Sequence, residues 1–229
     1  MLMTLEYWRE YRTYFHIGQS WGVTESTACR IIRKIERVLS EARVFTLPGK
    51  KYLYQSDYLI NTVVIDATES PIERPKKNIH QFYSGKKKKH TLKSQVVVNQ
   101  ETGEIICTAH GKGKMHDFRL FKQSQIALSK TIECWVDKGY QGMQKLHANS
   151  QIPKKKPRKG ELSDSDKKKN RELARKRVID EHINRKLKIF KILADRYRNR
   201  RKRFGLRFNL IAGLYNYELR LSQPNNKQN

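Results

Sequence analysis

VVIDATES, residues 63 to 70, is an apolar run that ends abruptly on an acidic residue, Asp66. β-Branched residues in such a run are typical of a buried strand. A second stretch, CWVDKGYQG (residues 134 to 142), repeats the feature, because its apolar residues also end on an aspartate, Asp137. A single aspartate at a strand end is most often a turn former or a helix N-cap. Two such aspartates raise the question of whether their strands are neighbours.

The sequence around these stretches predicts how the strands connect. Strand patterns cover NTVVIDAT (61–68), TLKSQVVVNQ (91–100), GEIICTAHG (103–111) and TIECWVD (131–137), with SQIP (150–153) as a brief fifth strand. A short amphipathic helix is expected over residues 116–129. This helix provides a crossover, so the 131–137 strand can pair in parallel with the 61–68 strand. The pattern predicts a mixed α/β fold class, an α+β mixed sheet in which the two aspartates meet.

Composition indicates a polyanionic partner. The 229 residues include 49 Lys or Arg and 22 Asp or Glu, a formal net charge of +27 at pH 7. So large an excess is self-repulsive, and nucleic acid is the first expectation, ahead of a membrane surface. The basic runs 86–89 and 196–203 are candidates for contacts with DNA phosphates, with Tyr197 and Phe204 packing inward. No apolar run approaches membrane-spanning length and no secretory leader opens the chain, so we expect a soluble intracellular protein.

The segment from Leu5 to Glu41 carries apolar residues at helical spacing. Gly22 breaks it with a turn, and Thr24 is a good N-cap for a second helix. This is the pattern of a helix-turn-helix, whose second helix would enter the DNA major groove. The alternative is a small helical bundle that serves as an oligomer contact. The candidate DNA-binding residues on the outer face of the second helix are Ser26, Thr27, Arg30, Arg33 and Lys34.

Asp66 and Asp137, if close together, repel each other and predict a bound cation. Mg²⁺ is the simplest choice beside a phosphodiester, because one or two carboxylates hold it together with water and phosphate oxygens. A third acid would complete a two-metal phosphoryl-transfer site, and the best candidate is Glu181. Asp180 competes for this role one helical step away, but the neighbouring cations favour Glu181. On a helix, three cations share the face of Glu181: Arg177, Arg185 and Lys188.

These features resemble the IS5-type insertion-sequence transposases, a DDE family with a ribonuclease-H-like catalytic domain. The resemblance rests on VVIDATES, WVDKGYQG, GKMHDFRLFK (113–122) and the stretch from VIDEHINRKLKIFK to GLYNYEL (178–219). The Arg, Glu and Lys of the transposase signature Tyr-x2-Arg-x3-Glu-x6-Lys fall on Arg177, Glu181 and Lys188. Ala174 stands at the Tyr position, which is a departure from the signature. The resemblance implies a catalytic and metal-binding triad of Asp66, Asp137 and Glu181.

The resemblance also implies a function. It predicts hydrolysis of DNA phosphodiesters at the ends of the insertion sequence, followed by strand transfer, with Mg²⁺ as cofactor and Mn²⁺ as a substitute. The expected partners are double-stranded DNA, both terminal inverted repeats and target DNA, and further copies of the chain in a homodimer or larger synaptic complex. The expected location is the bacterial cytoplasm, at the nucleoid, without membrane association. Relatives carry further helices before the helix-turn-helix, so an N-terminally shortened copy is expected.

Two alternatives belong to other classes of function. One is a catalytically inactive or truncated DNA-binding protein that represses the element. The other is a basic RNA-binding protein, which leaves the paired aspartates without a role. The predicted organisation is a helix-turn-helix DNA-binding segment at 1–48, a linker at 49–61, a ribonuclease-H-like DDE catalytic domain at 62–221 and a disordered tail at 222–229.

Overall fold

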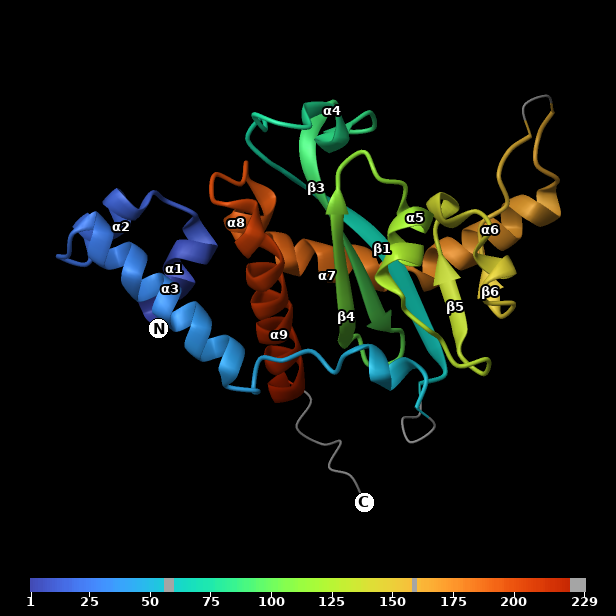
Figure 1. The fold of residues 1–229 in the computed structure, drawn as a ribbon. Coiled ribbons are helices and arrows are strands. Elements are labelled where there is room, and N and C mark those ends of the chain that lie inside the picture. The colour runs from blue at the N-terminus through green and yellow to red at the C-terminus, as the bar shows by residue number, and fades with distance from the viewer. Residues whose placement is uncertain (56–59, 158–159, 223–229) are drawn as a thin grey trace, which may run out of the picture. The chain divides into compact units, whose positions relative to one another are not determined.

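The structure, a computed structural model, describes residues 1–55, 60–157 and 160–222 (Figure 1). Spatial contacts divide the chain into two compact units. Unit 1 comprises residues 1–47, 70–92 and 185–229, and unit 2 comprises residues 48–69 and 93–184. Residues 223–229 of the predicted tail and 56–59 of the predicted linker lie outside the described residues. The predicted domain boundaries stay predictions.

The described strands form a mixed sheet. β1 (Thr62–Pro71) lies between β3 (Lys89–Asn99) and β5 (Glu133–Val136), in the order β2-β3-β1-β5-β6, and β4 pairs with β3. β5 is parallel to both β1 and β6, whereas β2 is antiparallel to β3. The predicted mixed α/β fold class is therefore confirmed, including the brief strand near residue 150. The shorter strands are β2 (Tyr83–Ser84), β4 (Ile105–Lys112) and β6 (Ser150–Gln151).

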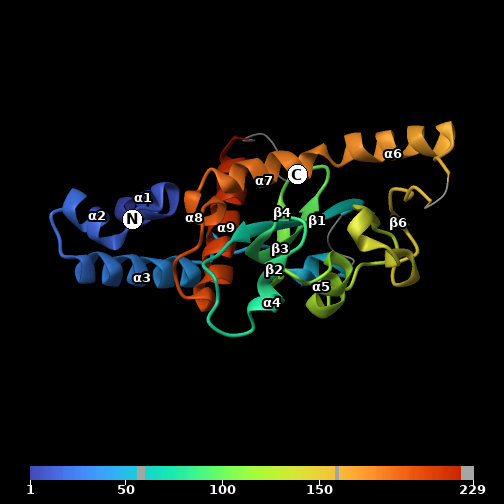
Figure 2. The same ribbon diagram turned by 90° about the horizontal axis from the view of Figure 1, so that it is seen from above.

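Side chains that alternate along β1 and β5 separate the two faces of the sheet in unit 2. Val63, Ile65, Cys134 and Val136 belong to the main hydrophobic core, together with side chains from β4 and α5 (Asp117–Ser124). The intervening Trp135 is buried on the opposite face. In Figure 2 the strands lie between α5 on one side and, on the other, α6 (Asp164–Lys176) with the first part of α7 (Val178–Lys188). Unit 2 is therefore layered as helix, sheet and helix.

Unit 1 combines the first three helices of the chain with its last one. These helices are α1 (Leu2–Glu10), α2 (Tyr14–Ser20), α3 (Glu25–Glu41) and α9 (Phe204–Ser222). The predicted first helix is split, because Tyr11 adopts a left-handed conformation (φ 51°) and Thr13 caps α2. Gly213 allows α9 to pack closely, since a Cβ at this position would lie 1.8 Å from the carbonyl oxygen of Phe45.

The sequence from 172 to 221 is nearly all compatible with helix, with a break expected near Phe204 and Gly205; the structure divides it further, into the end of α6, α7, α8 (Lys191–Ala194) and α9. The other short elements are α4 (Ile79–Phe82) and the 3-10 turns η1 (Lys50–Leu53), η2 (Lys138–Tyr140), η3 (Met143–Lys145) and η4 (Arg201–Arg203). None of the helices in the described residues is long and apolar enough to cross a lipid bilayer.

Candidate active site

Asp66 and Asp137 occupy equivalent positions on two neighbouring parallel strands. β1 and β5 pair with Ile65 opposite Val136, and each aspartate is the next residue of its chain segment. The prediction that these strands pair in parallel is confirmed. Asp137 also caps η2, since its Oδ1 accepts a hydrogen bond from the backbone N–H of Gly139 at 2.7 Å. The catalytic role of the two aspartates stays a prediction.

Asp66 has a cationic neighbour, Arg177, on the side of the sheet that α6 and α7 cover. Nη2 of Arg177 lies 3.5 Å from Oδ1 of Asp66, and the two side chains are 17% and 25% exposed. Burial raises the pKa of Asp66, and the charge of Arg177 opposes that shift. The negative charge of Asp137 raises the pKa further, which means that the two carboxylates are close enough to repel each other.

α7 buries Asp180 and leaves Glu181 exposed at the surface. Asp180 is 3% exposed, and its Oδ2 has no hydrogen-bond partner. Burial and then the charge of Asp66 raise the pKa of Asp180 well above its usual value. The apolar residues Ile183 and Leu187, which are also buried, follow Asp180 by three and seven positions and mark the inward face of the helix. That periodicity is the sequence signal that predicts Asp180, rather than Glu181, as the buried acid of the helix.

Three polar atoms spaced along α7 and its start are buried without a hydrogen-bond partner among the described residues: Arg177 Nε, Asp180 Oδ2 and Asn184 Oδ1. Buried polar atoms are rarely unpaired, so this face indicates a site that a polar or charged ligand completes. Of the other cations predicted to share the face of Glu181, Arg185 is exposed and Lys188 is half-buried further along the helix.

A fourth acid, Asp117, lies beside η2, the turn that follows Asp137. Oδ1 of Asp117 accepts a hydrogen bond from Nζ of Lys93 at 2.6 Å, and that lysine lies 3.7 Å from Glu69. A Cβ added to Gly139 would lie 2.4 Å from Asp117 Oδ2 and 2.9 Å from Asp137 Oδ1, so these two carboxylates flank the glycine. Asp117 follows the strand exit and would suit a helix N-cap by sequence, but it is the first residue of α5, whose N-cap is His116, and its carboxylate is held by Lys93.

The donor set suits a hard cation in kind. Asp66 within β1 and Asp137 directly after β5 offer carboxylate oxygens on neighbouring strands, and Oδ2 of the buried Asp180 has no hydrogen-bond partner among the described residues. Within the described residues, no three His, Cys, Asp or Glu side chains come close enough together to hold a metal ion. The chemistry of the two neighbouring aspartates still fits a metal site, because their oxygens can bind a cation together with water or phosphate oxygens.

The second candidate region is the helix-turn-helix of α2 and α3. Gly22 makes the turn with a φ of +63°, and the side chain of Thr24 accepts a hydrogen bond from the backbone N–H of Thr27, capping α3. Ile17 and Ala28 are fully buried between the helices. The predicted helix, turn and second helix are therefore confirmed in outline.

The predicted DNA-binding side chains of α3 differ in exposure. Thr27 is half-buried, and its Oγ1 accepts hydrogen bonds from the hydroxyl of Thr24 and from Nη2 of Arg30. This contact orders the arginine at the start of the helix. The remaining candidates, together with Arg30 itself, are exposed: Ser26, Arg33 and Lys34.

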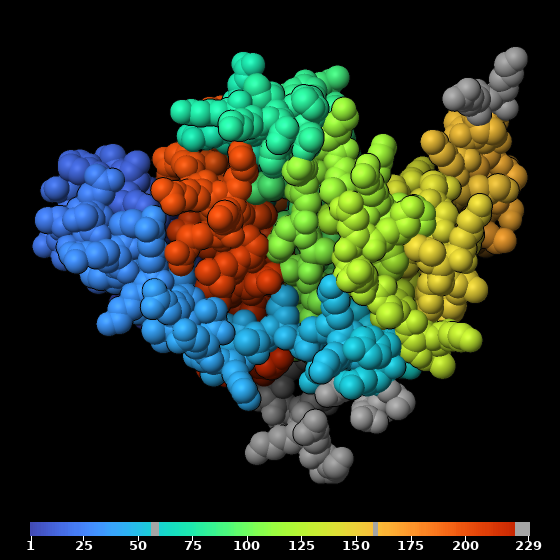
Figure 3. Space-filling view, in the orientation of Figure 1, coloured from blue at the N-terminus to red at the C-terminus, as the bar shows by residue number. Residues whose placement is uncertain are grey.

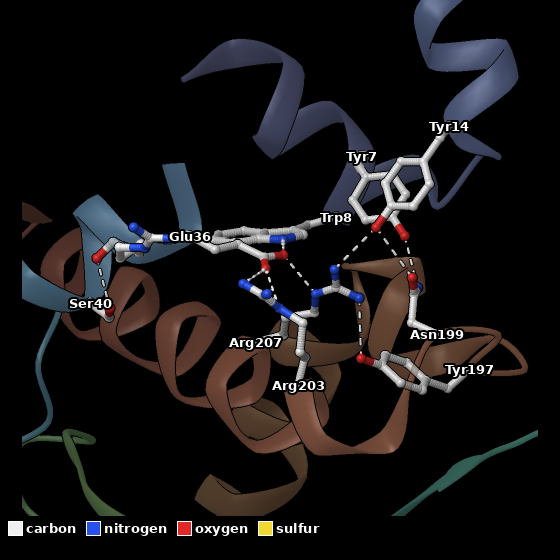
Figure 4. Close-up of polar contacts among 10 residues, drawn as sticks. Tyr7, Trp8, Tyr14, Glu36, Ser40, Tyr197, Asn199, Arg203 and Arg207 are labelled. Atoms are coloured by element: carbon white, nitrogen blue, oxygen red, sulfur yellow. Dashed lines mark hydrogen bonds and ion pairs between the residues drawn. The ribbon is translucent and has the colours of Figure 1, made fainter. Parts of the chain in front are cut away.

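A buried polar network fixes α3 to α9 (Figure 4). The carboxylate of Glu36 on α3 is fully buried and accepts hydrogen bonds from Nε of Arg207 at 2.6 Å and Nε of Arg203 at 3.1 Å. Nε1 of Trp8 donates to the same carboxylate at 3.3 Å. Nη1 of Arg207 extends the network, because it donates a hydrogen bond to the hydroxyl of Tyr197 at 3.1 Å. The orientation of α3 in unit 1 therefore depends on α9.

The arginine-rich run 196–203 is only partly free for DNA. Tyr197 and Phe204 are buried, as predicted. Arg203 pairs with a buried glutamate, and Arg198 donates to the backbone oxygen of Tyr11 while its guanidinium lies over that ring. These two arginines stabilise unit 1 itself, so charge counting in this segment overstates the number of cations that can reach DNA.

Comparison with known proteins agrees with both regions. A family model described as "DDE superfamily endonuclease" matches residues 65–216, and one described as "Helix-turn-helix of DDE superfamily endonuclease" matches residues 1–43. The chain is 56% identical over 221 residues to the "Probable transposase for insertion sequence element IS702" of Microchaete diplosiphon, and the alignment covers 96% of this chain and 80% of that protein. No solved structure matches the chain. With a mixed α/β sheet, two aspartates next to each other across a parallel strand pair and a helix-turn-helix of its own, the chain belongs to the DDE superfamily endonucleases.

Proposed function

We propose that the chain is the transposase of an insertion sequence, which hydrolyses DNA at the ends of the element and then joins the released 3′ ends to target DNA. The observation that carries the proposal is the register of β1 and β5, which brings Asp66, within β1, alongside Asp137, the residue that follows β5. A net charge of +27 and the helix-turn-helix support DNA as the substrate.

Membership in the DDE family implies a divalent metal ion, and we propose Mg²⁺, with Mn²⁺ as a substitute. Asp66 and Asp137 would hold it, with Glu181 as the third ligand implied by the transposase signature. When bound, the ion supplies Lewis acidity, which lowers the pKa of the attacking hydroxyl and offsets charge on the phosphate. Arg177 is suited to contact a phosphate oxygen, because its Nε is unpaired while its Nη2 faces Asp66.

The DNA is held by more than the reacting centre. Arg185 and Lys188 follow on α7 and are proposed to contact the backbone near the cut. The exposed side chains of α3 are proposed to read the terminal inverted repeat in the major groove. Because two ends must be joined, we propose a homodimer or larger synaptic complex. The nucleoid of the bacterial cytoplasm is the corresponding location. The side chains proposed for α3 are Ser26, Thr27, Arg30, Arg33 and Lys34.

The test is cleavage of labelled DNA that carries the element's own ends, in Mg²⁺ or Mn²⁺. We expect the parent protein to nick at the ends and Asp137→Asn to lose on the order of 10³-fold in rate, which corresponds to several kcal/mol of lost charge stabilisation. DNA binding by the variant should be retained. The control is Asp164→Asn on α6, because its side chain is almost fully exposed.

Three outcomes separate the possibilities. Metal-dependent nicking that Asp137→Asn abolishes and Asp164→Asn preserves supports the proposal. Equal loss in both variants points to damaged folding or expression rather than to the site. Sequence-specific binding with no cleavage by the parent protein contradicts the proposed activity and favours the alternative, an inactive DNA-binding repressor.

A further inference from the structure

A small basic hollow lies in unit 1, where parts of the basic runs 86–89 and 196–203 meet. It has a volume of about 280 Å³ and its floor includes the end of β1 at Pro71 and Ile72. No acidic side chain of the described residues lines it. The other lining residues are all basic: Arg74, Lys88, Lys89, His90 and Arg196.

Backbone hydrogen bonds hold the three segments of the hollow together. The N–H of Ile72 donates to the carbonyl of His90 at 2.8 Å, and the N–H of Tyr197 donates to the carbonyl of Pro71 at 2.8 Å. Ile72 and Tyr197 also form a parallel β-bridge. In Figure 3 the surface of residues 72–90 borders the orange-red surface that follows α8. Segments more than a hundred residues apart in sequence are therefore fixed side by side, and the hollow is built into the fold.

The turn that carries the lysines is fixed as well. β2 and β3 pair with Ser84 opposite Lys89, which closes the turn over residues 85–88. Lys88 adopts a left-handed backbone conformation with a φ of 53°. A residue other than glycine takes this conformation at a cost in free energy, so the surrounding structure holds Lys88 at the rim.

The cations of the hollow have no counter-charge in the part of the chain that the structure describes. None of Arg74, Lys88, Lys89 and Arg196 forms an ion pair or a side-chain hydrogen bond within the described residues. The nearby Arg198 and Arg203 behave differently, because both contact acceptors inside unit 1. Cations that converge without an acid repel each other, and an external anion is the usual compensation.

We propose that this hollow binds a phosphate group of the DNA backbone. Two arginine forks and two ammonium groups match the oxygens of a phosphodiester, and the volume suits one phosphate group rather than a base pair. A contact of this kind positions DNA without reading its sequence. The inference rests on the proposed function for its substrate, DNA, but it adds a binding site separate from both the helix-turn-helix and the carboxylates.

The test measures the salt dependence of DNA binding by the full chain. Each phosphate contact contributes a slope of about 0.9 to the fall of log K with log salt concentration. We expect the double variant Arg74→Ala with Arg196→Ala to lower that slope by about one, equally for the element's ends and for a duplex of random sequence. The matched control is Lys76→Ala with Lys77→Ala, which removes two exposed charges of the same unit that do not line the hollow.

An unchanged slope in the arginine variant overturns the inference, and so does an equal decrease in the control, which would mean diffuse charge rather than a site. Thermal melting checks that the variants fold, and Arg74→Lys with Arg196→Lys should restore the slope. Calorimetry with inorganic phosphate tests the other source of the same chemistry: binding that the variant loses, with no change in the DNA slope, would indicate a site for a free anion and overturn the DNA assignment. Asp137→Asn must keep the full slope, so loss of cleavage and loss of this contact are distinguishable.

Discussion

The substitution Glu36→Gln tests how strongly the DNA-reading helix depends on α9. Glu36 is fully buried, Arg207 is 1% exposed, and the two atoms that join them are 2.6 Å apart. The neutral amide leaves the charge of Arg207 buried without a counter-ion. Removing one partner of a buried ion pair costs about 3–5 kcal/mol. At roughly 2–4 °C per kcal/mol for a chain of this size, we expect the melting temperature to fall by about 6–20 °C.

The assay is thermal unfolding, followed by duplex binding at a temperature where the variant is still folded. The control is Glu10→Gln, which breaks the exposed pair between Glu10 and Lys191 and should leave the unfolding midpoint unchanged. Replacing both buried partners, as Glu36→Leu with Arg207→Met, should recover most of the lost stability, because no buried charge remains. A Glu36→Gln midpoint that matches the Glu10→Gln midpoint would refute the reasoning.

Three further outcomes are expected. Glu181→Gln should abolish cleavage without changing stability, because this side chain is exposed. Asp180→Asn should raise the free energy of unfolding of the metal-free protein at neutral pH, because burial raises the pKa of Asp180. Cleavage assays and denaturation curves on both variants check these outcomes. Gly139→Ala should lose cleavage but keep DNA binding in a gel-shift assay, since the new methyl group would displace the flanking carboxylates. Burial raises the pKa of Cys134 to about 12, whereas Cys29 is only half-buried, so of these two thiols only that of Cys29 should react with a thiol reagent at pH 8. The stability that the protein has below the unfolded-state thiol pKa of about 8.5 should be lost as the pH rises toward 12.

The parallel pairing of β1 and β5 could be predicted because its determinants are local or general. The apolar runs identify the strands, and a helical crossover between strands of one sheet leads to a parallel pair. The turn of the helix-turn-helix could also be predicted, because Gly22 and Thr24 determine the backbone only of residues close to them in sequence. These features allow the aspartates and the α3 face to be predicted from sequence alone.

The positions of several charged residues could not be predicted, because their partners are distant in sequence. Lys93 lies in a strand between Leu92 and Ser94, yet it is buried, because Asp117 reaches it from a later helix. Arg203 lies in a run that favours DNA contact, yet Glu36 on the third helix binds it. The burial of Asp180 and the exposure of Glu181 depend on the rotation of α7, which its buried apolar residues indicate.

The link between α3 and α9 affects the timing of DNA recognition during synthesis. The segment that carries the recognition residues leaves the ribosome first, but the arginine that neutralises Glu36 belongs to the helix that leaves last. A nascent chain that has exposed only its first helices holds an acid on the inner face of α3 with no cation to meet it. The proposed recognition of the element's ends therefore requires the finished chain, because fragments that end before α9 lack the arginine that stabilises α3.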